Sequence, residues 1–436
     1  MLFNWLGDRM EKNECMGTVD EMPDSGLSVL FTERMNKINY AIRDLVEEAK
    51  KIECTGRKVD LKLNIGDPIM FDFKPPKVML KAHAKALREN KSFYADSQGV
   101  IELREAIVHK EKRWNNVKGL DSCDILITNG VSEAAQFLSA AIIDRNSKAL
   151  VDGPGYPLYT TLTEFYGGEA IYYLKDESRG WQPDIEDIEK KIKNNPKIKY
   201  LLSINPNNPT GAVLGKKTQK EILNLAGQHN LILVSDEVYD HMTYGDNARF
   251  YSMGSLADDI PVVLFNGFSK GYLVPGWRLG YAAFVNPDEK LNLLKEEMLK
   301  LARSRLCANT PAQYACISAL MGEHEHVPEV NQKLKKRANL SYKRLNEIDG
   351  LSATKPDGAF YIFPKIEQGV GANSIWKSDK EFVLDLLKEK GVLTVHGSGF
   401  GGNVGPHFRI AFLPKPDVLN EAYDRIEDFM KNRLKE

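Results

Sequence analysis

The segment at residues 266–281, NGFSKGYLVPGWRLGY, decides how the rest of the chain is interpreted. It begins where an apolar run at 262–265 ends, and open α/β sheets bind ligands at the carboxyl ends of their strands. Lys270 is therefore expected at the mouth of a pocket, where a desolvated amine can form a Schiff base with an aldehyde. Because most lysines are solvated surface charges, the functional interpretation of Lys270 needs support from other segments.

Short β-rich runs alternate with helical stretches on both sides of this segment. The β-rich runs lie at 125–128, 198–204, 231–235, 262–265 and 279–285, and the helical stretches at 133–143 and 217–227. This alternation predicts an α/β domain with a mostly parallel sheet flanked by helices. Past about residue 328, long charged helices surround strand-like runs at 359–364 and 408–412. This second texture predicts a smaller α+β domain.

We expect the chain to divide into four parts. Residues 1–27 are a polar extension broken by a Pro-Asp-Ser-Gly turn, and we assign no chemistry to them. Residues 28–74 hold a helical pattern and a short extended stretch, and they are expected to join the small domain. We expect a large cofactor-binding domain at 75–327 and a small C-terminal domain at 328–436.

Composition and charge favour a small-molecule partner. The 436 residues are 42% hydrophobic, and a net charge of -1 gives no overall attraction to nucleic acid or to a membrane surface. The five cysteines show no CxxC pair or framework spacing, which favours reduced thiols. Acidic residues within positions 1–15 interrupt any signal-peptide core. We expect a cytoplasmic protein without a metal site.

A second segment, at 231–239, reads as an apolar strand that ends in acidic residues. Asp236 closes the run and Tyr239 follows it. An acidic residue at this point can equally cap the next helix. If this strand lies beside the one before Lys270, Asp236 can hold the proton of a pyridinium nitrogen while Lys270 binds the aldehyde of the same ring. Tyr239 can then donate to the ring's phenolic oxygen.

A strand–glycine–helix junction at 128–133 is a candidate phosphate site. Gly130, Val131 and Ser132 stand at a helix start, where free backbone N–H groups favour a phosphate. Arg278 offers a forked cationic donor to the same group. Helix entry alone also explains such a junction.

Three further side chains have both a structural and a functional explanation. Asn208 lies in the rigid turn Asn-Pro-Asn-Asn-Pro-Thr-Gly at 205–211, where its amide can donate to a ring oxygen or a substrate carboxylate. Tyr156 can stack on a flat heterocycle or simply pack. Arg409 interrupts an apolar strand, so it needs an anionic partner, either an internal carboxylate or that of a substrate.

These segments, in this order, resemble the class I aminotransferases of the fold-type I pyridoxal-phosphate (PLP) superfamily. The resemblance runs from about residue 28 to the C-terminus. It rests on Asn-Ile-Gly-Asp-Pro at 64–68, the turn at 205–211, Ser-Asp-Glu-Val-Tyr at 235–239, Ser-Lys at 269–270 with Gly-Trp-Arg-Leu-Gly-Tyr at 276–281, and Phe-Arg at 408–409. It implies PLP-dependent transfer of amino groups between amino acids and 2-oxo acids.

The resemblance also implies roles around the cofactor ring. Lys270 would carry PLP as a Schiff base and then shuttle a proton between the substrate and the cofactor. Asp236 would keep the ring nitrogen protonated. Tyr239 and Asn208 would bond the phenolic oxygen, and Tyr156 would stack on the ring.

Further roles concern the phosphate and the substrate. The helix start at 130–132 and Arg278 would hold the phosphate, and Gly66 with Arg409 would frame the substrate α-carboxylate. Tyr94 resembles the tyrosine that the family lends to the phosphate of the neighbouring subunit, which implies a homodimer with shared active sites. Gly267 departs from the pattern, because the family often has a serine phosphate ligand there.

Within class I, the chain resembles the branch in which alanine and aspartate aminotransferases are mixed. The motifs at 306–313, 355–364 and 395–401 carry this resemblance. Glutamate and 2-oxoglutarate are the expected common pair. Arg303 or Arg305 either reads a second substrate carboxylate or is a helix-surface charge, and we favour the surface charge.

Two other functions compete with amino transfer. A lyase or decarboxylase is possible on the same fold, because the fold does not decide which substrate bond breaks. A non-catalytic PLP-binding regulator would need a basic helix-turn-helix appendage, for which the short acidic N-terminal extension leaves no room.

Overall fold

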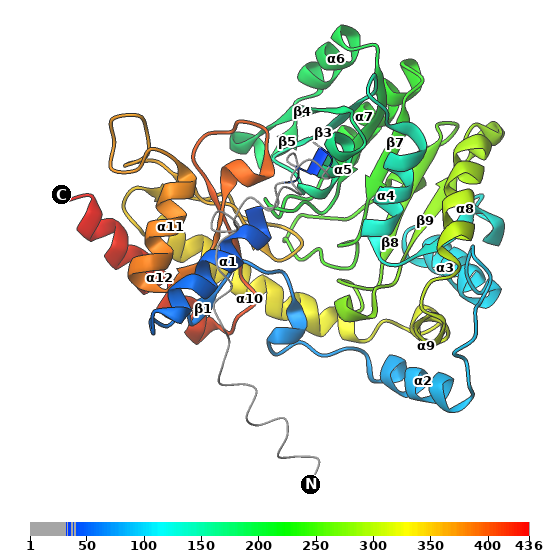
Figure 1. The fold of residues 1–436 in the computed structure, drawn as a ribbon, viewed down its shortest axis with the longest axis horizontal. Helices are drawn as coiled ribbons and strands as arrows, with labels where there is room; N and C mark the ends of the chain where they lie inside the picture. The colour runs from blue at the N-terminus through cyan, green and yellow to red at the C-terminus, as the bar shows by residue number, and fades with distance from the viewer. Residues whose placement is uncertain (1–31, 33, 36–37, 39–40, 436) are drawn as a thin grey trace.

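The computed structural model describes residues 32–435 apart from 33, 36, 37, 39 and 40. Its centre is an eight-stranded sheet in the order β2-β9-β8-β7-β6-β3-β4-β5 (Figure 1). The strands are β2 (Ile125–Thr128), β3 (Lys148–Gly153), β4 (Glu169–Asp176), β5 (Gln182–Pro183), β6 (Ile198–Ile204), β7 (Ile232–Asp236), β8 (Val262–Gly267) and β9 (Gly280–Val285). The pairs from β8 through β7, β6 and β3 to β4 are parallel. The predicted α/β class with a mostly parallel sheet is confirmed.

Helices cover both faces of this sheet (Figure 1). The helices of this part of the chain are α2 (Lys77–Arg88), which packs on α9, then α3 (Ile101–Trp114), α4 (Val131–Ile142), α5 (Leu158–Phe165), α6 (Ile185–Asn194), α7 (Lys216–Gln228), α8 (Asn292–Arg305) and α9 (Thr310–Leu320). Neighbouring residues of the central strands point into different apolar clusters: Leu201, Leu233 and Leu264 into one, and Leu202, Val234 and Val263 into the other. Burial on both faces explains why these strands read as continuous apolar runs.

The sequence pattern did not predict strands β3 and β4, because both carry charged residues. Asp152 in β3 and Lys175 in β4 are buried side by side, with Lys175 Nζ 2.6 Å from Asp152 Oδ2. A buried charge is tolerated when it is paired. This pairing joins residues far apart in the sequence, so a search for apolar runs does not detect it.

A second group of elements packs together beyond β9. Parallel β1 (Leu61–Lys62) and β13 (Val392–Leu393) form one sheet, β10 (Leu351–Ser352) and β12 (Lys365–Ile366) another, and β11 (Tyr361–Ile362), β15 (Phe408–Ala411) and β14 (Val395–His396) a third. Figure 1 shows α1 (Ala41–Cys54), α11 (Asp379–Lys390) and α12 (Pro416–Arg433) gathered here, with α10 (His326–Asn346) extending toward the large sheet. The N-terminal segment thus pairs with C-terminal strands, while the boundaries at 27, 74 and 327 remain predictions.

The cysteines give one correction. Cys123, Cys307 and Cys316 are free thiols, but Cys54 is disulfide-bonded, so the expectation of five reduced thiols is wrong. Spacing along the chain cannot exclude a bond between cysteines that folding brings together. Cys15 lies outside the described residues. Within the described part of the chain, no helix combines the length and hydrophobicity needed to cross a bilayer.

A buried ionic network connects helix α3 to the ends of strands β8 and β9. Lys110 of α3 is 1% exposed and donates to Asp240 at 2.5 Å and to Glu111 at 3.0 Å. Asn266 in β8 donates to the same Asp240 carboxylate at 2.8 Å. Tyr281 in β9 donates to Glu111 at 2.5 Å. The network therefore fixes the ends of neighbouring strands relative to one another.

Replacing Lys110 with methionine is expected to lower the free energy of unfolding by about 3–5 kcal/mol, because it leaves two carboxylates buried without their cation. The measurement is a urea unfolding curve at neutral pH. Lys112→Met on the exposed face of the same helix is the matched control and is expected to stay within about 0.5 kcal/mol of the parent. Equal midpoints for the two variants would contradict the account.

Candidate active site

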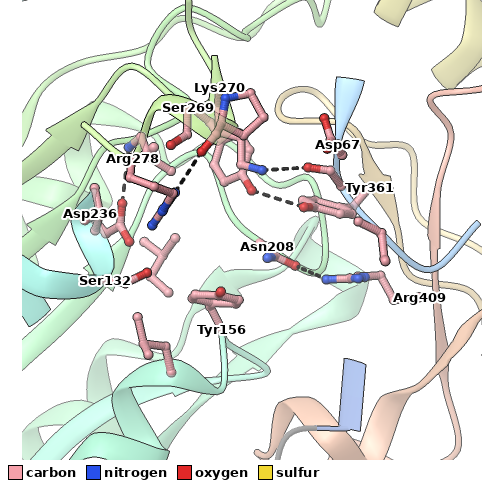
Figure 2. A pocket seen from close by; sticks show the side chains of 18 of the residues that line it. Asp67, Ser132, Tyr156, Asn208, Asp236, Ser269, Lys270, Arg278, Tyr361 and Arg409 are labelled. Atoms are coloured by element: carbon pink, nitrogen blue, oxygen red, sulfur yellow. Dashed lines mark hydrogen bonds between the residues drawn. The ribbon is translucent and has the colours of Figure 1, made fainter. Parts of the chain in front are cut away.

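A cavity of about 530 Å³ lies where the central strands end. This volume is within the range of about 300–1,000 Å³ typical of small-molecule sites. The candidate site residues from the sequence line the cavity except Gly130, Tyr94 and the alternatives Arg303 and Arg305. Figure 2 shows Lys270, Asp236 and Arg278 approaching it from one side, with Tyr361 and Arg409 opposite.

Parallel pairing of three strands brings the candidate residues together. Ile204, the last residue of β6, pairs with Asp236, the last of β7, and Asp236 pairs with Phe265 of β8. The loops that follow β6 and β8 therefore leave the sheet on either side of Asp236. They carry Asn208 and Lys270 to the same edge.

The Lys270 amine is the candidate nucleophile. Its Nζ donates to the backbone carbonyl of Gly66 at 2.6 Å. The pKa of Lys270 is lowered to about 8, mainly by burial; Asp67 opposes this shift, and the positive charges of Arg409 and Arg278 contribute to it. A substantial fraction of the amine is therefore neutral near pH 8, which is the form that attacks a carbonyl.

The Asp236 carboxylate has partners that hold its charge. Tyr159 donates to Asp236 Oδ2 at 2.7 Å, and the Val238 backbone N–H donates to Oδ1 at 3.2 Å. Burial raises the pKa of Asp236, the two hydrogen bonds limit that rise, and the resulting pKa is about 6. The group is mostly ionised at neutral pH and can pair with a cationic ring nitrogen. Sequence reasoning missed Tyr159, three residues after Tyr156 in the same turn and helix start.

The Tyr239 hydroxyl lies 3.2 Å from the hydroxyl of Tyr361. Burial raises the pKa of Tyr239 well above its ordinary value, with a further contribution from Tyr361. Tyr239 therefore stays protonated and is available as a donor. Tyr361, which lines the cavity from β11, was also missed by the sequence reasoning.

Arg409 is 1% exposed and contacts no carboxylate among the described residues. Its Nη1 donates to Asn208 Oδ1 at 3.0 Å and its Nη2 to the carbonyl of Asn64, while its Nε has no partner (Figure 2). Of the two explanations given for Arg409, the internal ion pair finds no support. An unpaired buried guanidinium in a cavity wall is suited to an incoming carboxylate.

The α4 start and Arg278 form a second cationic corner. The first N–H groups of a helix have no partner inside the helix, and Val131 and Ser132 line the cavity at this end of α4. Arg278 reaches the loop because Gly130 lacks a side chain: a Cβ on Gly130 would meet Arg278 Nη2 at 2.6 Å. These donors match the needs of a phosphate.

Gly267 has a structural explanation. It pairs with Gly280 between β8 and β9, and a Cβ on Gly267 would meet Gly280 Cα at 3.0 Å. A Cβ on Gly280 would in turn meet the Val131 backbone nitrogen at 2.8 Å. Two glycines thus let β9 pass directly beneath the α4 start, and no serine donor is available there.

The remaining candidates lie as follows. Tyr156 lines the cavity (Figure 2). Tyr94 is 81% exposed and lies outside the cavity lining. Arg303 is 3.3 Å from Glu296, and Arg305 donates to the carbonyl of Ile127 at 3.0 Å. Neither arginine lines the cavity. Arg303 is exposed, in agreement with the preferred surface-charge interpretation, but Arg305 is largely buried and lies 3.4 Å from Glu133, so that interpretation is wrong for Arg305.

The site fits PLP by the chemistry of its groups. An amine with a lowered pKa, a buried carboxylate and a cationic helix start are three separate requirements of a pyridine aldehyde with a phosphate arm. Lys270, Asp236 and the Arg278 corner meet them within one cavity of adequate volume.

Comparison with known proteins agrees with this geometry. Residues 58–426 match the model of a family described as aminotransferase class I and II. The chain is 37% identical over 401 residues to the alanine aminotransferase of Mycobacterium tuberculosis strain H37Rv, covering 91% of each chain. It is 38% identical over 404 residues to the glutamate-pyruvate aminotransferase AlaA of Escherichia coli K12, covering 92% of this chain and 97% of that one.

Solved structures give the same result. The alanine aminotransferase of Pyrococcus furiosus is similar with a TM-score of 0.88 and 51% identity, over 92% of this chain and 100% of that one. An aspartate aminotransferase of Thermus thermophilus with maleate is similar with a TM-score of 0.80 and 28% identity, over 91% of this chain and 99% of that one.

Labelling of Lys270 in the cofactor-free protein by a small amine-reactive reagent is expected to rise with a midpoint near pH 8, because the neutral amine reacts and burial lowers its pKa to about 8. Peptide mass spectrometry across a pH series measures the labelling at this one site. Arg409→Leu removes a nearby positive charge and is expected to move the midpoint upward. A parental midpoint above about pH 10, the range of an unperturbed lysine, would contradict the account.

Proposed function

The chain belongs to the aminotransferase class I and II family and is an aminotransferase, and from this premise we propose that it binds PLP on Lys270 and transfers amino groups between L-alanine and 2-oxoglutarate. The observation that carries the proposal is the placement of Lys270 and Asp236 in one cavity with a cationic helix start. The reaction would proceed in two halves, with the amino acid donating first and the 2-oxo acid accepting second.

PLP, when bound, supplies an aldehyde that takes up the amino group and a ring that withdraws electrons from the substrate α-carbon. Lys270 would hold the cofactor and would be the base that moves the α-proton. A pKa near 8 suits this exchange, because a general base works best when its pKa is close to the working pH. Its amine already lies at the Gly66 backbone, where the substrate carboxylate end is expected.

The other cavity residues orient the ring. Asp236 would keep a proton on the ring nitrogen by pairing with it as a carboxylate, and Tyr159 holds that carboxylate in place. Tyr239 and Asn208 would donate to the phenolic oxygen, and Tyr156 would stack on the ring. Because these groups come from rigid strand ends and short turns, they are in place before substrate arrives.

The phosphate is proposed to bind at the α4 start. The N–H groups of Val131 and Ser132 and the guanidinium of Arg278 surround that end of the cavity. Gly130 suits this corner because its φ of +79° favours glycine and a Cβ there would crowd the Arg278 guanidinium. Because residue 267 is a glycine and offers no side-chain donor, these donors and Tyr94 of a partner subunit are the proposed phosphate ligands.

Charge in the cavity supports alanine as the donor. Arg278 and Arg409 are the arginines that line the described cavity. With Arg278 on the phosphate and Arg409 on the α-carboxylate, the second carboxylate of aspartate would have no arginine of its own. The second carboxylate of 2-oxoglutarate lies one methylene farther from its α-carbon than that of aspartate. The names of the relatives from Mycobacterium tuberculosis and Pyrococcus furiosus point to the same amino acid.

We also propose a homodimer with shared sites. Tyr94 is exposed and outside its own cavity, as expected of a residue that serves another subunit. Phe93 beside it and Leu306 are also exposed large apolar side chains, and such groups are typically covered in an interface. A cytoplasmic location remains a prediction from the sequence.

L-Alanine mixed with the PLP-loaded protein, without a 2-oxo acid, is expected to release about one pyruvate per subunit and no ammonia, because the amino group stays on the protein until an acceptor arrives. L-Aspartate is expected to react at least about tenfold more slowly, since its second carboxylate lacks a partner. Rapid-quench sampling with product assays measures both. Lys270→Ala is the control and is expected to release none. Continued turnover with ammonia would replace the proposal with a lyase.

Mixing Tyr94→Leu with Lys270→Ala subunits, unfolded and refolded together, is expected to restore about a quarter of the parental activity at limiting PLP. Half of the randomly formed dimers would be hybrids with one complete site. Asp236→Ala mixed with Lys270→Ala is the matched control and should restore none, because both residues belong to the same subunit's site. Equal results from the two mixtures would contradict site sharing.

A further inference from the structure

Tyr361 contacts both Tyr239 and Arg409, two residues to which the proposed function gives different roles. It begins β11 and pairs with Ala411 of β15, two residues beyond Arg409 in the same strand. Its side chain is 3% exposed and lines the cavity. Figure 2 shows its ring between the Lys270 side and Arg409.

The first contact of Tyr361 is with Tyr239. Their hydroxyl oxygens are 3.2 Å apart, and either can donate to the other. Burial raises the pKa of both phenols, so both stay protonated at neutral pH. If Tyr239 directs its own proton at the phenolic oxygen of PLP, it must accept the proton of Tyr361. The two hydroxyls then form a chain with one direction, in which each hydrogen bond strengthens the next.

The second contact is with Arg409. The guanidinium carbon is 4.5 Å from the centre of the Tyr361 ring and 4.9 Å from that of Phe400. These distances are those of cation–π contacts, which are strongest when desolvated. Arg409 has two hydrogen-bond partners and no counter-ion among the described residues. The rings therefore help to hold the guanidinium where it can meet a carboxylate.

The third contact explains Gly66. A Cβ on Gly66 would come within 2.0 Å of the Tyr361 hydroxyl oxygen and within 2.6 Å of the Phe360 ring. Glycine at this position is therefore required for Tyr361 to reach Tyr239. The carbonyl of the same Gly66 accepts a hydrogen bond from the Lys270 amine. Tyr361 therefore packs against the backbone residue that Lys270 contacts.

We propose that Tyr361 is a positioning residue whose hydroxyl orients and polarises Tyr239, and whose ring holds Arg409 for the substrate α-carboxylate. This inference rests on the proposed PLP chemistry. The two roles use different parts of the side chain, so two substitutions separate them: Tyr361→Phe removes the hydroxyl alone, and Tyr361→Leu removes the hydroxyl and the ring.

The test of the hydroxyl is a pH titration of the visible absorption of bound PLP. A weaker donor at Tyr239 stabilises the ionised phenolic oxygen less, so Tyr361→Phe is expected to move the spectral midpoint upward by about half a pH unit or more. In a Tyr239→Phe background the same substitution is expected to change nothing further. Tyr244→Phe removes another buried phenol, bonded to the Gly358 carbonyl and outside the cavity lining, and is the matched control.

The role of the Tyr361 ring is tested by comparing the KM values of the Tyr361→Phe and Tyr361→Leu variants. Tyr361→Phe is expected to keep KM for alanine and 2-oxoglutarate within about twofold, because its ring still faces Arg409. Tyr361→Leu is expected to raise both KM values roughly 3- to 30-fold. Thermal melting of both variants, compared with Tyr244→Phe, separates this effect from a loss of folded protein.

Each result of these experiments either supports or overturns the proposed role of Tyr361. An unmoved midpoint in Tyr361→Phe, a shift that persists without the Tyr239 hydroxyl, or unchanged KM values in a folded Tyr361→Leu would overturn the inference alone. A parent protein with no visible cofactor band and no turnover would overturn the proposed function, and this inference with it.

Discussion

The parallel alignment of β6, β7 and β8 is the constraint on which the site depends. Parallel neighbours end at the same edge of a sheet, and the pairing of Ile204 with Asp236 and of Asp236 with Phe265 puts that edge in one place. Polar groups gather there because the middles of β6, β7 and β8 are buried on both faces and are mostly apolar. The small sheets close the cavity from the other side with Tyr361 and Arg409. An amine, an acid and a buried guanidinium therefore meet although they are far apart in the sequence.

Burial gives these groups their reactivity. It lowers the pKa of Lys270 to about 8 and raises that of Asp236 to about 6, so both charges are easier to neutralise than in water. Between these values the acid is ionised and the amine is close to losing its proton, which is the combination that amino transfer needs. The partners then adjust the balance: Tyr159 favours the Asp236 carboxylate, and the positive charge of Arg409 disfavours a second cation at Lys270.

Sequence reasoning succeeded where local pattern and structure agree. β2 and β6 have the predicted bounds, because both are continuous apolar runs that end at a turn. It failed at β3 and β4, where the buried Asp152–Lys175 pair interrupts the pattern. The cavity residues at strand ends were predicted from their positions, but Tyr159 and Tyr361 were not. Their importance comes from contacts with Asp236 and Tyr239, which lie 77 and 122 residues away along the chain.

The central claim is a covalent bond between the amine of Lys270 and the aldehyde of PLP. Borohydride reduction of the PLP-saturated protein, followed by peptide mass mapping, tests it most directly. The account predicts loss of the visible absorption band and one phosphopyridoxyl group per subunit, attached to the peptide that contains Lys270. A protein that takes up no cofactor, or that carries the reduced label on a different lysine, would contradict it.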